Sequence, residues 1–132
     1  MSENLALVRS IFTAWEGGDF SSAHWAHPDI LFESTGFDAM KTAGAAEMAE
    51  RWREWMSTWE EYRTEADEFR ELDGERVLVL MQHGGRGKAS GLGIEGIKRP
   101  GANMFEIRDG KVVRLALYWN REDAFADLGL AE

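Results

Sequence analysis

The chain has 132 residues, no cysteine and a formal net charge of −9, with 15 lysines and arginines against 24 aspartates and glutamates. This length suits one domain spanning residues 1–132. The lack of cysteine excludes disulfides and thiolate metal sites and favours a reduced, cytoplasmic setting. The negative charge argues against nucleic acid and anionic membranes as partners, and no apolar run is long enough to cross a bilayer.

The first third of the chain predicts two helices and a strand. Apolar residues recur at helical spacing over residues 4–15, before the stop signal Gly17-Gly18. Asp19 is expected to cap a second, short helix over residues 20–25, which His27-Pro28 terminates. The strand that follows places three side chains on one face, namely Ile30, Phe32 and Ser34.

The middle of the chain predicts a helix and then a change to strands. After a loop through Gly36 and Gly44, residues 45–58 form the longest predicted helix, with a wide apolar stripe. The stripe comprises Met48, Trp52, Trp55, Met56 and Trp59. Residues 60–73 are expected to form a strand that needs a bulge to bring Phe69 and Leu72 into the layer of its other apolar residues.

One strand and a hairpin follow. Residues 76–85, after a turn at Asp73-Gly74, are apolar on both faces until the far end, which predicts a central strand covered on both sides. The strongest signal is Asp109-Gly110 between two alternating runs in residues 103–119, because a type I′ hairpin turn needs a positive φ at both central residues. One face of its second strand is predicted to carry Val113, Leu115, Leu117 and Trp119.

The chain then closes with a helix over residues 121–128, capped by Asn120 and stopped by Gly129. The order of helices followed by a run of antiparallel strands is typical of an α+β fold with the helices packed on a curved sheet.

Three stretches carry a resemblance to a known family. They are the residues Val-Arg-Ser-Ile-Phe-Thr-Ala-Trp at 8–15 with Gly-Asp-Phe at 18–20, His-Pro-Asp-Ile at 27–30, and Arg-Asp-Gly-Lys-Val-Val-Arg-Leu at 108–115. In this order and spacing they resemble SnoaL-like proteins of the nuclear transport factor 2-like (NTF2-like) superfamily, which includes ketosteroid isomerases and polyketide cyclases. The resemblance covers nearly the whole chain.

The resemblance implies a cone in which a curved antiparallel or mixed sheet wraps around a long helix, with a pair of helices at the N-terminus. It also implies a deep, mostly apolar pocket, no cofactor, and a homodimer formed through the outer face of the sheet. The outer row Val112, Ala116 and Tyr118 is apolar, in keeping with such an interface. The ketosteroid isomerase pattern of catalytic groups is missing, because its positions fall on Ile11, Ser34 and Asn103. A serine cannot take a proton from carbon at neutral pH, and the Asp/Arg/Asp set of limonene epoxide hydrolases is also absent.

His83 and Asn103 are the candidate catalytic residues, because by alternation both face the inside of the cone. His83 would act as a general base, and Asn103 would donate a hydrogen bond to a developing oxyanion. A lone histidine at the end of an apolar row is, however, more often a structural residue, and an inward asparagine often only bonds a neighbouring strand.

The candidate ligand-binding residues are Trp15, Ser34, Trp52, Met81, Phe105 and Trp119. No metal site is expected, because His24 and His27 flank a proline and lack a third ligand. The glycines of residues 84–101 fit neither a dinucleotide-binding nor a phosphate-binding motif and are read as a twisted hairpin at the pocket mouth.

Two functions therefore stay open. The first is a cofactor-free acid/base enzyme, of isomerase, cyclase or hydro-lyase type, acting on a small apolar compound that contains rings. The second is a protein of the same fold that binds such a compound without turnover, or that serves as a dimeric scaffold. Whether the protein is an enzyme is left undecided by the sequence.

Overall fold

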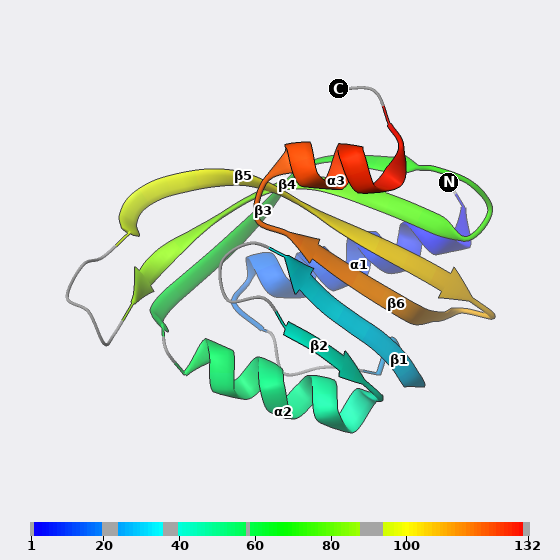
Figure 1. The fold of residues 1–132 in the computed structure, drawn as a ribbon, viewed down its shortest axis with the longest axis horizontal. Coiled ribbons are helices and arrows are strands. Elements are labelled where there is room, and N and C mark those ends of the chain that lie inside the picture. Colours follow the sequence, from blue (N-terminus) through cyan, green and yellow to red (C-terminus); the bar gives the residue numbers. More distant parts are fainter. Residues whose placement is uncertain (1, 20–23, 36–39, 58, 88–93, 131–132) are drawn as a thin grey trace.

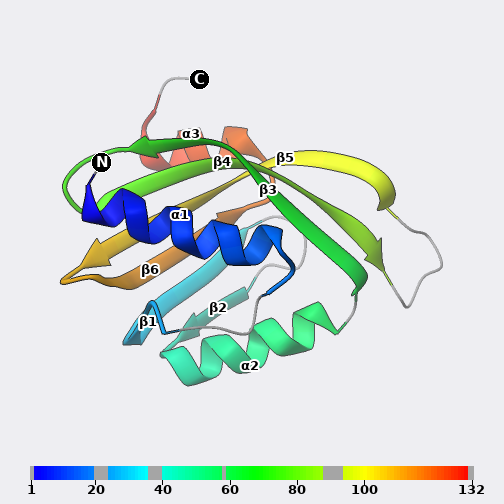
Figure 2. The same cartoon turned by 180° about the vertical axis from the view of Figure 1, so that it is seen from behind.

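The computed structural model describes residues 2–19, 24–35, 40–57, 59–87 and 94–130. The elements in chain order are α1 (Glu3–Glu16), β1 (Ala26–Thr35), β2 (Met40–Ala43), α2 (Ala45–Met56), β3 (Trp59–Glu71), β4 (Arg76–Gly87), β5 (Ile94–Arg108), β6 (Lys111–Tyr118) and α3 (Arg121–Leu128). The strands form one mixed sheet in the order β2-β1-β6-β5-β4-β3. The inner face of this sheet curves around α1 and α2, and α3 lies on the outer face (Figures 1 and 2). The predicted α+β class is confirmed.

The first helix begins and ends where the sequence predicts. The side chain of Ser2 accepts a hydrogen bond from the backbone N–H of Leu5, and Gly17 follows the last turn. The buried stripe of α1 consists of Val8, Ile11, Phe12 and Trp15. The predicted second helix falls largely outside the described residues, and His24 and Trp25 form a turn that leads directly into β1.

The start of the sheet differs from the prediction. His27-Pro28 does not end a helix but lies inside β1, at an irregularity where the pairing of β1 with β6 shifts between Ala26 and Leu31. A proline is tolerated there because the bulge removes the need for its missing N–H. The predicted loop between Gly36 and Gly44 contains the short strand β2, which pairs antiparallel with β1.

The second helix and the strand after it largely follow the sequence pattern. α2 has 12 residues, two fewer than α1, so it is not the longest described helix. Met48 on α2 is 2% exposed and packs into the inner core, whereas Trp59 belongs to β3 and not to the helical stripe. The bulge expected in this strand is present, as a register shift between Ala66 and Glu68.

The central strand and its neighbours match the prediction closely. Residues on both faces of β4 are buried, from Val77 on the inner side to Leu78 on the outer side, because α1 covers one face of the sheet and α3 the other. The hairpin turn has positive φ at both central positions, 53° at Asp109 and 76° at Gly110. Asn120 caps α3 by accepting from the N–H of Asp123.

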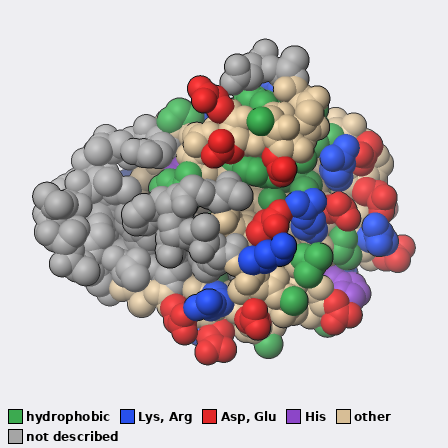
Figure 3. Space-filling view, viewed as in Figure 1, with side chains coloured by type: hydrophobic (Ala, Val, Ile, Leu, Met, Phe, Trp, Pro, Cys, Tyr) green, Lys and Arg blue, Asp and Glu red, His purple; other side chains and the backbone are tan. Residues whose placement is uncertain are grey.

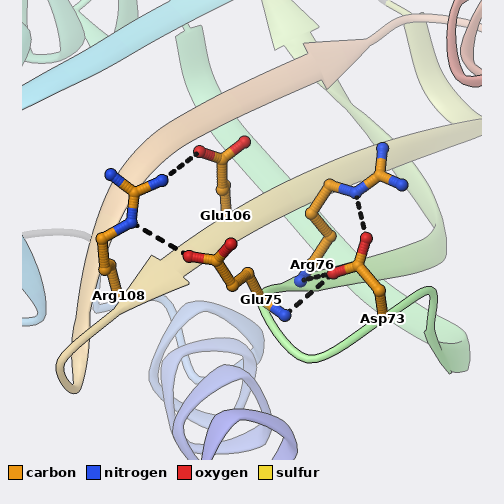
Figure 4. Close-up of polar contacts among 5 residues, drawn as sticks. All are labelled: Asp73, Glu75, Arg76, Glu106 and Arg108. Carbon is orange, nitrogen blue, oxygen red and sulfur yellow. Dashed lines mark hydrogen bonds and ion pairs between the residues drawn. The ribbon is translucent and has the colours of Figure 1, made fainter.

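The turn between β3 and β4 is fixed by charged side chains that also reach the end of β5 (Figure 4). The carboxylate of Asp73 accepts hydrogen bonds from the backbone N–H groups of Glu75 and Arg76 and from Nε of Arg76, at 2.8 to 2.9 Å. Glu75 in turn accepts from Nε of Arg108 at 2.9 Å, and Arg108 lies 3.6 Å from the carboxylate of Glu106.

One inner row differs from the prediction because β6 contains an irregularity. The pairing with β5 shifts between Glu106 and Ile107, so that Val112 pairs with Ile107 and both lie in the inner core. A bulge puts two residues opposite one and turns the next side chain to the other face. Val112 therefore takes the inner position predicted for Val113.

The outer face carries a second, smaller core beneath α3. Ala116 and Tyr118 are buried there together with Ala124 and Phe125 of the helix. The row on which the expected dimer interface rested is thus covered within the subunit or, for Val112, turned inward. The homodimer stays a prediction. Around the helix, acidic and basic side chains are interspersed on this face (Figure 3).

Candidate functional site

The register of the sheet places the polar candidate residues of the inner face in neighbouring rows. One row crosses the sheet through Ser34, Leu117, Asn103 and Val79, which pair in that order from β1 to β4. Strands lie about 4.8 Å apart, so Ser34 and Asn103 are separated by about 10 Å with Leu117 between them. Met81 pairs with Gly101, and His83 pairs with Thr64 and Arg99.

Three of the candidate ligand-binding residues pack against one another near α1 and α2. The ring of Trp15 lies 5.5 Å from that of Trp52 and 6.0 Å from that of Phe105, measured between centroids. Trp52 also contacts Phe32 at 5.3 Å. These distances are typical of aromatic side chains that form a core, so this end of the inner face is filled by the protein's own rings.

His83 lies at the other end, against Gly101 and Trp119. His83 is 5% exposed, and its ring centroid is 4.2 Å from that of Trp119 in an edge arrangement. A Cβ built on Gly101 would lie 2.9 Å from both Cδ2 and Nε2 of His83. Gly101 therefore provides the space that the imidazole occupies, which is why a glycine suits the interior of this strand.

The contact between His83 and Trp119 also bears on the tautomer of the histidine. Nε2 of His83 lies 3.3 Å from the backbone carbonyl oxygen of Trp119. A carbonyl oxygen can only accept, so this contact is a hydrogen bond when Nε2 carries the proton. In the neutral ring the lone pair then resides on Nδ1, which is the nitrogen that can take up a second proton.

Two more buried polar residues share the inner face with this histidine: Thr64 is its cross-strand neighbour, and Asn103 pairs with Val79, four positions before His83 on β4. Asn103 is 4% exposed and follows Gly101 by two positions on the same face of β5. Thr64 is 6% exposed and stands opposite His83 on β3, and its hydroxyl is enclosed without a hydrogen-bond partner in the part of the chain that the structure describes. Buried polar groups on an apolar surface are costly unless they bond to something.

The structure thus brings some of the predicted residues together and separates others. The first group lies on neighbouring inner positions of β4, β5 and the end of β6, and consists of His83, Asn103, Met81 and Trp119. The second group is the aromatic cluster of Trp15, Trp52 and Phe105. Ser34 is 7% exposed and stands two strands from Asn103. The sequence reading missed Gly101 and did not single out Thr64. A glycine inside a strand was the available signal for a close approach of another group.

Two features that the sequence does not lead us to expect are a metal site and a membrane-spanning helix. Within residues 2–19, 24–35, 40–57, 59–87 and 94–130, no three histidine, aspartate or glutamate side chains are grouped so that they could hold a metal ion. None of the three described helices has the length and apolar character needed to cross a membrane.

Solved structures with this architecture are numerous, and three illustrate its range. An NTF2-like protein of unknown function from Burkholderia pseudomallei superposes with a TM-score of 0.77 at 20% identity, covering 96% of this chain and 97% of that chain. TerC, co-crystallised with polyporic acid, gives 0.71 at 20% identity, covering 96% and 98%. An LEH-like epoxide hydrolase from M. tuberculosis gives 0.67 at 20% identity, covering 96% and 89%.

These identities establish a shared fold and no more. No curated protein matches the sequence significantly. The model of the SnoaL-like domain, in contrast, matches residues 8–115, which is well over half of the chain. The chain therefore belongs to the SnoaL-like family, within the NTF2-like fold.

Proposed function

We propose that this protein binds a small, mainly apolar, ring-containing compound against the inner face of its sheet and acts on it by acid/base chemistry without a cofactor. The observation that carries the proposal is the placement of His83 and Asn103, two residues at least 95% buried, on inner positions on either side of the row that holds Gly101. In an apolar environment each polar group interacts more strongly with a reacting atom than it would in water.

The two residues have complementary roles in this proposal. Nδ1 of His83 takes a proton from a carbon next to a carbonyl group, and the released electron pair moves onto the carbonyl oxygen. The amide N–H of Asn103 donates a hydrogen bond to that oxygen as it gains negative charge. Return of the proton from His83 to a different carbon of the compound completes an isomerisation. In a cyclisation, the enolate carbon attacks a second carbonyl carbon of the same compound, and His83 returns the proton to the alkoxide that forms. In an elimination, the enolate expels a hydroxyl group from the neighbouring carbon, and this group leaves as water with the proton from His83.

A second candidate function is binding without turnover, or use of the fold as a dimeric scaffold. The contact of His83 with the Trp119 carbonyl favours it, because a ring that is oriented by backbone has a structural role already. The packing of Trp15 against Trp52 favours it too, since these rings contact each other. TerC has been co-crystallised with polyporic acid. This supports the idea that a protein of this fold can bind a small organic compound.

The test is a screen of steroid-, terpene- and polyketide-like ring compounds that carry a carbonyl or hydroxyl group. Binding is followed by tryptophan fluorescence and turnover by mass spectrometry. For a compound that is converted, His83→Gln is expected to lower kcat by about 10²- to 10⁴-fold, and Asn103→Leu by about 10²- to 10³-fold.

The matched control is His24→Gln, which makes the same change at an exposed histidine. It should leave both binding and turnover unchanged. Turnover that survives His83→Gln would rule out the proposed base. Compounds that bind but are never converted would favour the second candidate.

A further inference from the structure

An arginine on the outer face of the sheet bonds to the backbone directly behind the candidate site. Arg121 is the first residue of α3. Its Nε donates to the carbonyl oxygen of Gly101 at 3.2 Å, and its Nη2 donates to the carbonyl oxygen of Met81 at 3.1 Å. Gly101 and Met81 are cross-strand partners on β5 and β4. One guanidinium therefore joins the two strands at the row between Asn103 and His83.

The arginine is held in turn by a carboxylate at the bulge of β3. Nη2 of Arg121 donates to Oδ2 of Asp67 at 2.7 Å, and Nε2 of Gln82 donates to the same oxygen at 3.0 Å. Asp67 lies between Ala66 and Glu68, where the pairing of β3 with β4 shifts. Bulges of this kind aim side chains and interrupt the ladder of backbone bonds. Here the bulge presents a carboxylate to the arginine.

The hydrogen bonds of Arg121 on the outer face are linked to His83 on the inner face through two residues that the histidine contacts, Gly101 and Trp119. The imidazole of His83 lies over Gly101, whose carbonyl the arginine binds. The ring and the carbonyl of Trp119 also contact the imidazole, and Trp119 precedes Arg121 by only two residues. Moving the arginine would therefore shift both the backbone beneath the histidine and the residue beside it.

We propose that Arg121, held by Asp67, is a positioning residue for the His83 site. It does not contact the ligand; it fixes the backbone of Gly101 and the start of α3, and through them the orientation of the imidazole against Trp119. The role as a positioning residue in catalysis rests on the function proposed above. The orientation of the histidine is a property of the protein alone and can be measured without any ligand.

A structural ion pair elsewhere on the same face provides the matched control. Arg114 is paired with Glu33, and their side chains are 35% and 26% exposed, close to the 28% and 34% of Arg121 and Asp67. Ion pairs that are partly exposed to solvent, as these are, contribute little to stability. The two pairs differ in that the guanidinium of Arg121 also binds two backbone carbonyl groups behind the site.

The experiment compares Arg121→Gln with Arg114→Gln by NMR, observing the ring signals of His83 and the indole N–H signal of Trp119. Arg121→Gln is expected to shift both sets of signals well beyond the shifts in Arg114→Gln, and Arg121→Lys to restore them in part. If Arg121→Gln does not fold, Asp67→Asn removes the charge of the partner and is used instead. His83 and Trp119 signals that match those of the Arg114→Gln protein would overturn the proposal.

With a converted compound from the screen, the same variants separate the two proposals. Arg121→Gln should lower kcat on the order of tenfold to a hundredfold, since small displacements of a reacting group have effects of that size, while KM changes little. A loss of turnover in His83→Gln but not in Arg121→Gln would leave the proposed function standing and remove the positioning role. Turnover unaffected by either variant would remove both.

Discussion

Replacing Gly101 with alanine probes the close approach of His83 to β5. The added Cβ would lie 2.8 Å from the carbonyl oxygen of Tyr118 and 2.9 Å from Cδ2 and Nε2 of His83. Ordinary contact begins at 3.4 Å, so the first distance is short by 3.4 − 2.8 = 0.6 Å. The imidazole can rotate away, but the carbonyl of Tyr118 belongs to the sheet and cannot.

The expected cost follows from this combination. Overpacking a well-packed interior by one methyl group typically destabilises a protein by about 1–3 kcal/mol. A loss of about 2 kcal/mol lowers the folding equilibrium constant roughly thirtyfold. Urea unfolding of Gly101→Ala, followed by tryptophan fluorescence, should therefore show a lower midpoint at an unchanged slope.

Two further variants locate the source of the effect. Gly74→Ala is the control, because a Cβ there would have no neighbour within 4 Å, and its free energy of unfolding should stay within about 0.5 kcal/mol of the wild type. In a double-mutant cycle with His83→Ala, part of the cost of Gly101→Ala should disappear, and the part due to the Tyr118 carbonyl should remain. If Gly101→Ala were as stable as the wild type, with His83 signals unmoved, the geometry argued for this site would be wrong.

Three further predictions concern the polar groups around the sheet. Thr64→Val should leave the free energy of unfolding unchanged or raise it, because the lost hydroxyl has no partner among the described residues; a clear loss in urea unfolding would contradict this. Tyr118→Phe should cost about 0.5–1.5 kcal/mol, since its hydroxyl donates to Asp127. Burial, and next the bond to Asp127, raise the pKa of Tyr118, so this contribution is fully present below the pH of about 10 at which an unfolded tyrosine titrates and declines above it; the wild-type advantage should therefore shrink in alkaline urea titrations. Glu33→Gln should cost at most about 1 kcal/mol, and less in high salt, because its pair with Arg114 is partly exposed; a cost independent of salt would show that packing dominates.

The parts of the fold that the sequence predicts well are those with a local cause. Asp109-Gly110 forms the turn because those two residues tolerate the left-handed conformation that the hairpin needs. Asn120 and Gly129 mark the ends of α3 through bonds to atoms within four residues. The burial of both faces of β4 follows from the apolar residues that this strand carries on each face. In each case the information lies within one short stretch of chain.

The parts that were missed depend on strands pairing with distant partners. β2 has only four residues, and it exists because β1 offers an edge to pair with. Val112 takes the inner position predicted for Val113 because the pairing of β6 with β5 shifts nearby. A shift of one residue in the register moves each following side chain to the opposite face of the sheet. Pro28 fits within β1 because the pairing of β1 with β6 is irregular there. Alternation along a single strand cannot reveal such shifts.

The candidate site combines both kinds of information. The alternation of β4 and β5 was sufficient to turn His83 and Asn103 inward, but not to show what they meet. The contact of His83 with Trp119 joins residues 36 positions apart, and its closeness depends on the absence of a side chain at Gly101. A polar residue facing inward is thus a weak indication of function by itself. The indication of function becomes stronger when a neighbouring position has no side chain, so that the polar ring can lie there. It is stronger still when the backbone at that position is held from the other face of the sheet, as the carbonyl group of Gly101 is held here by Arg121.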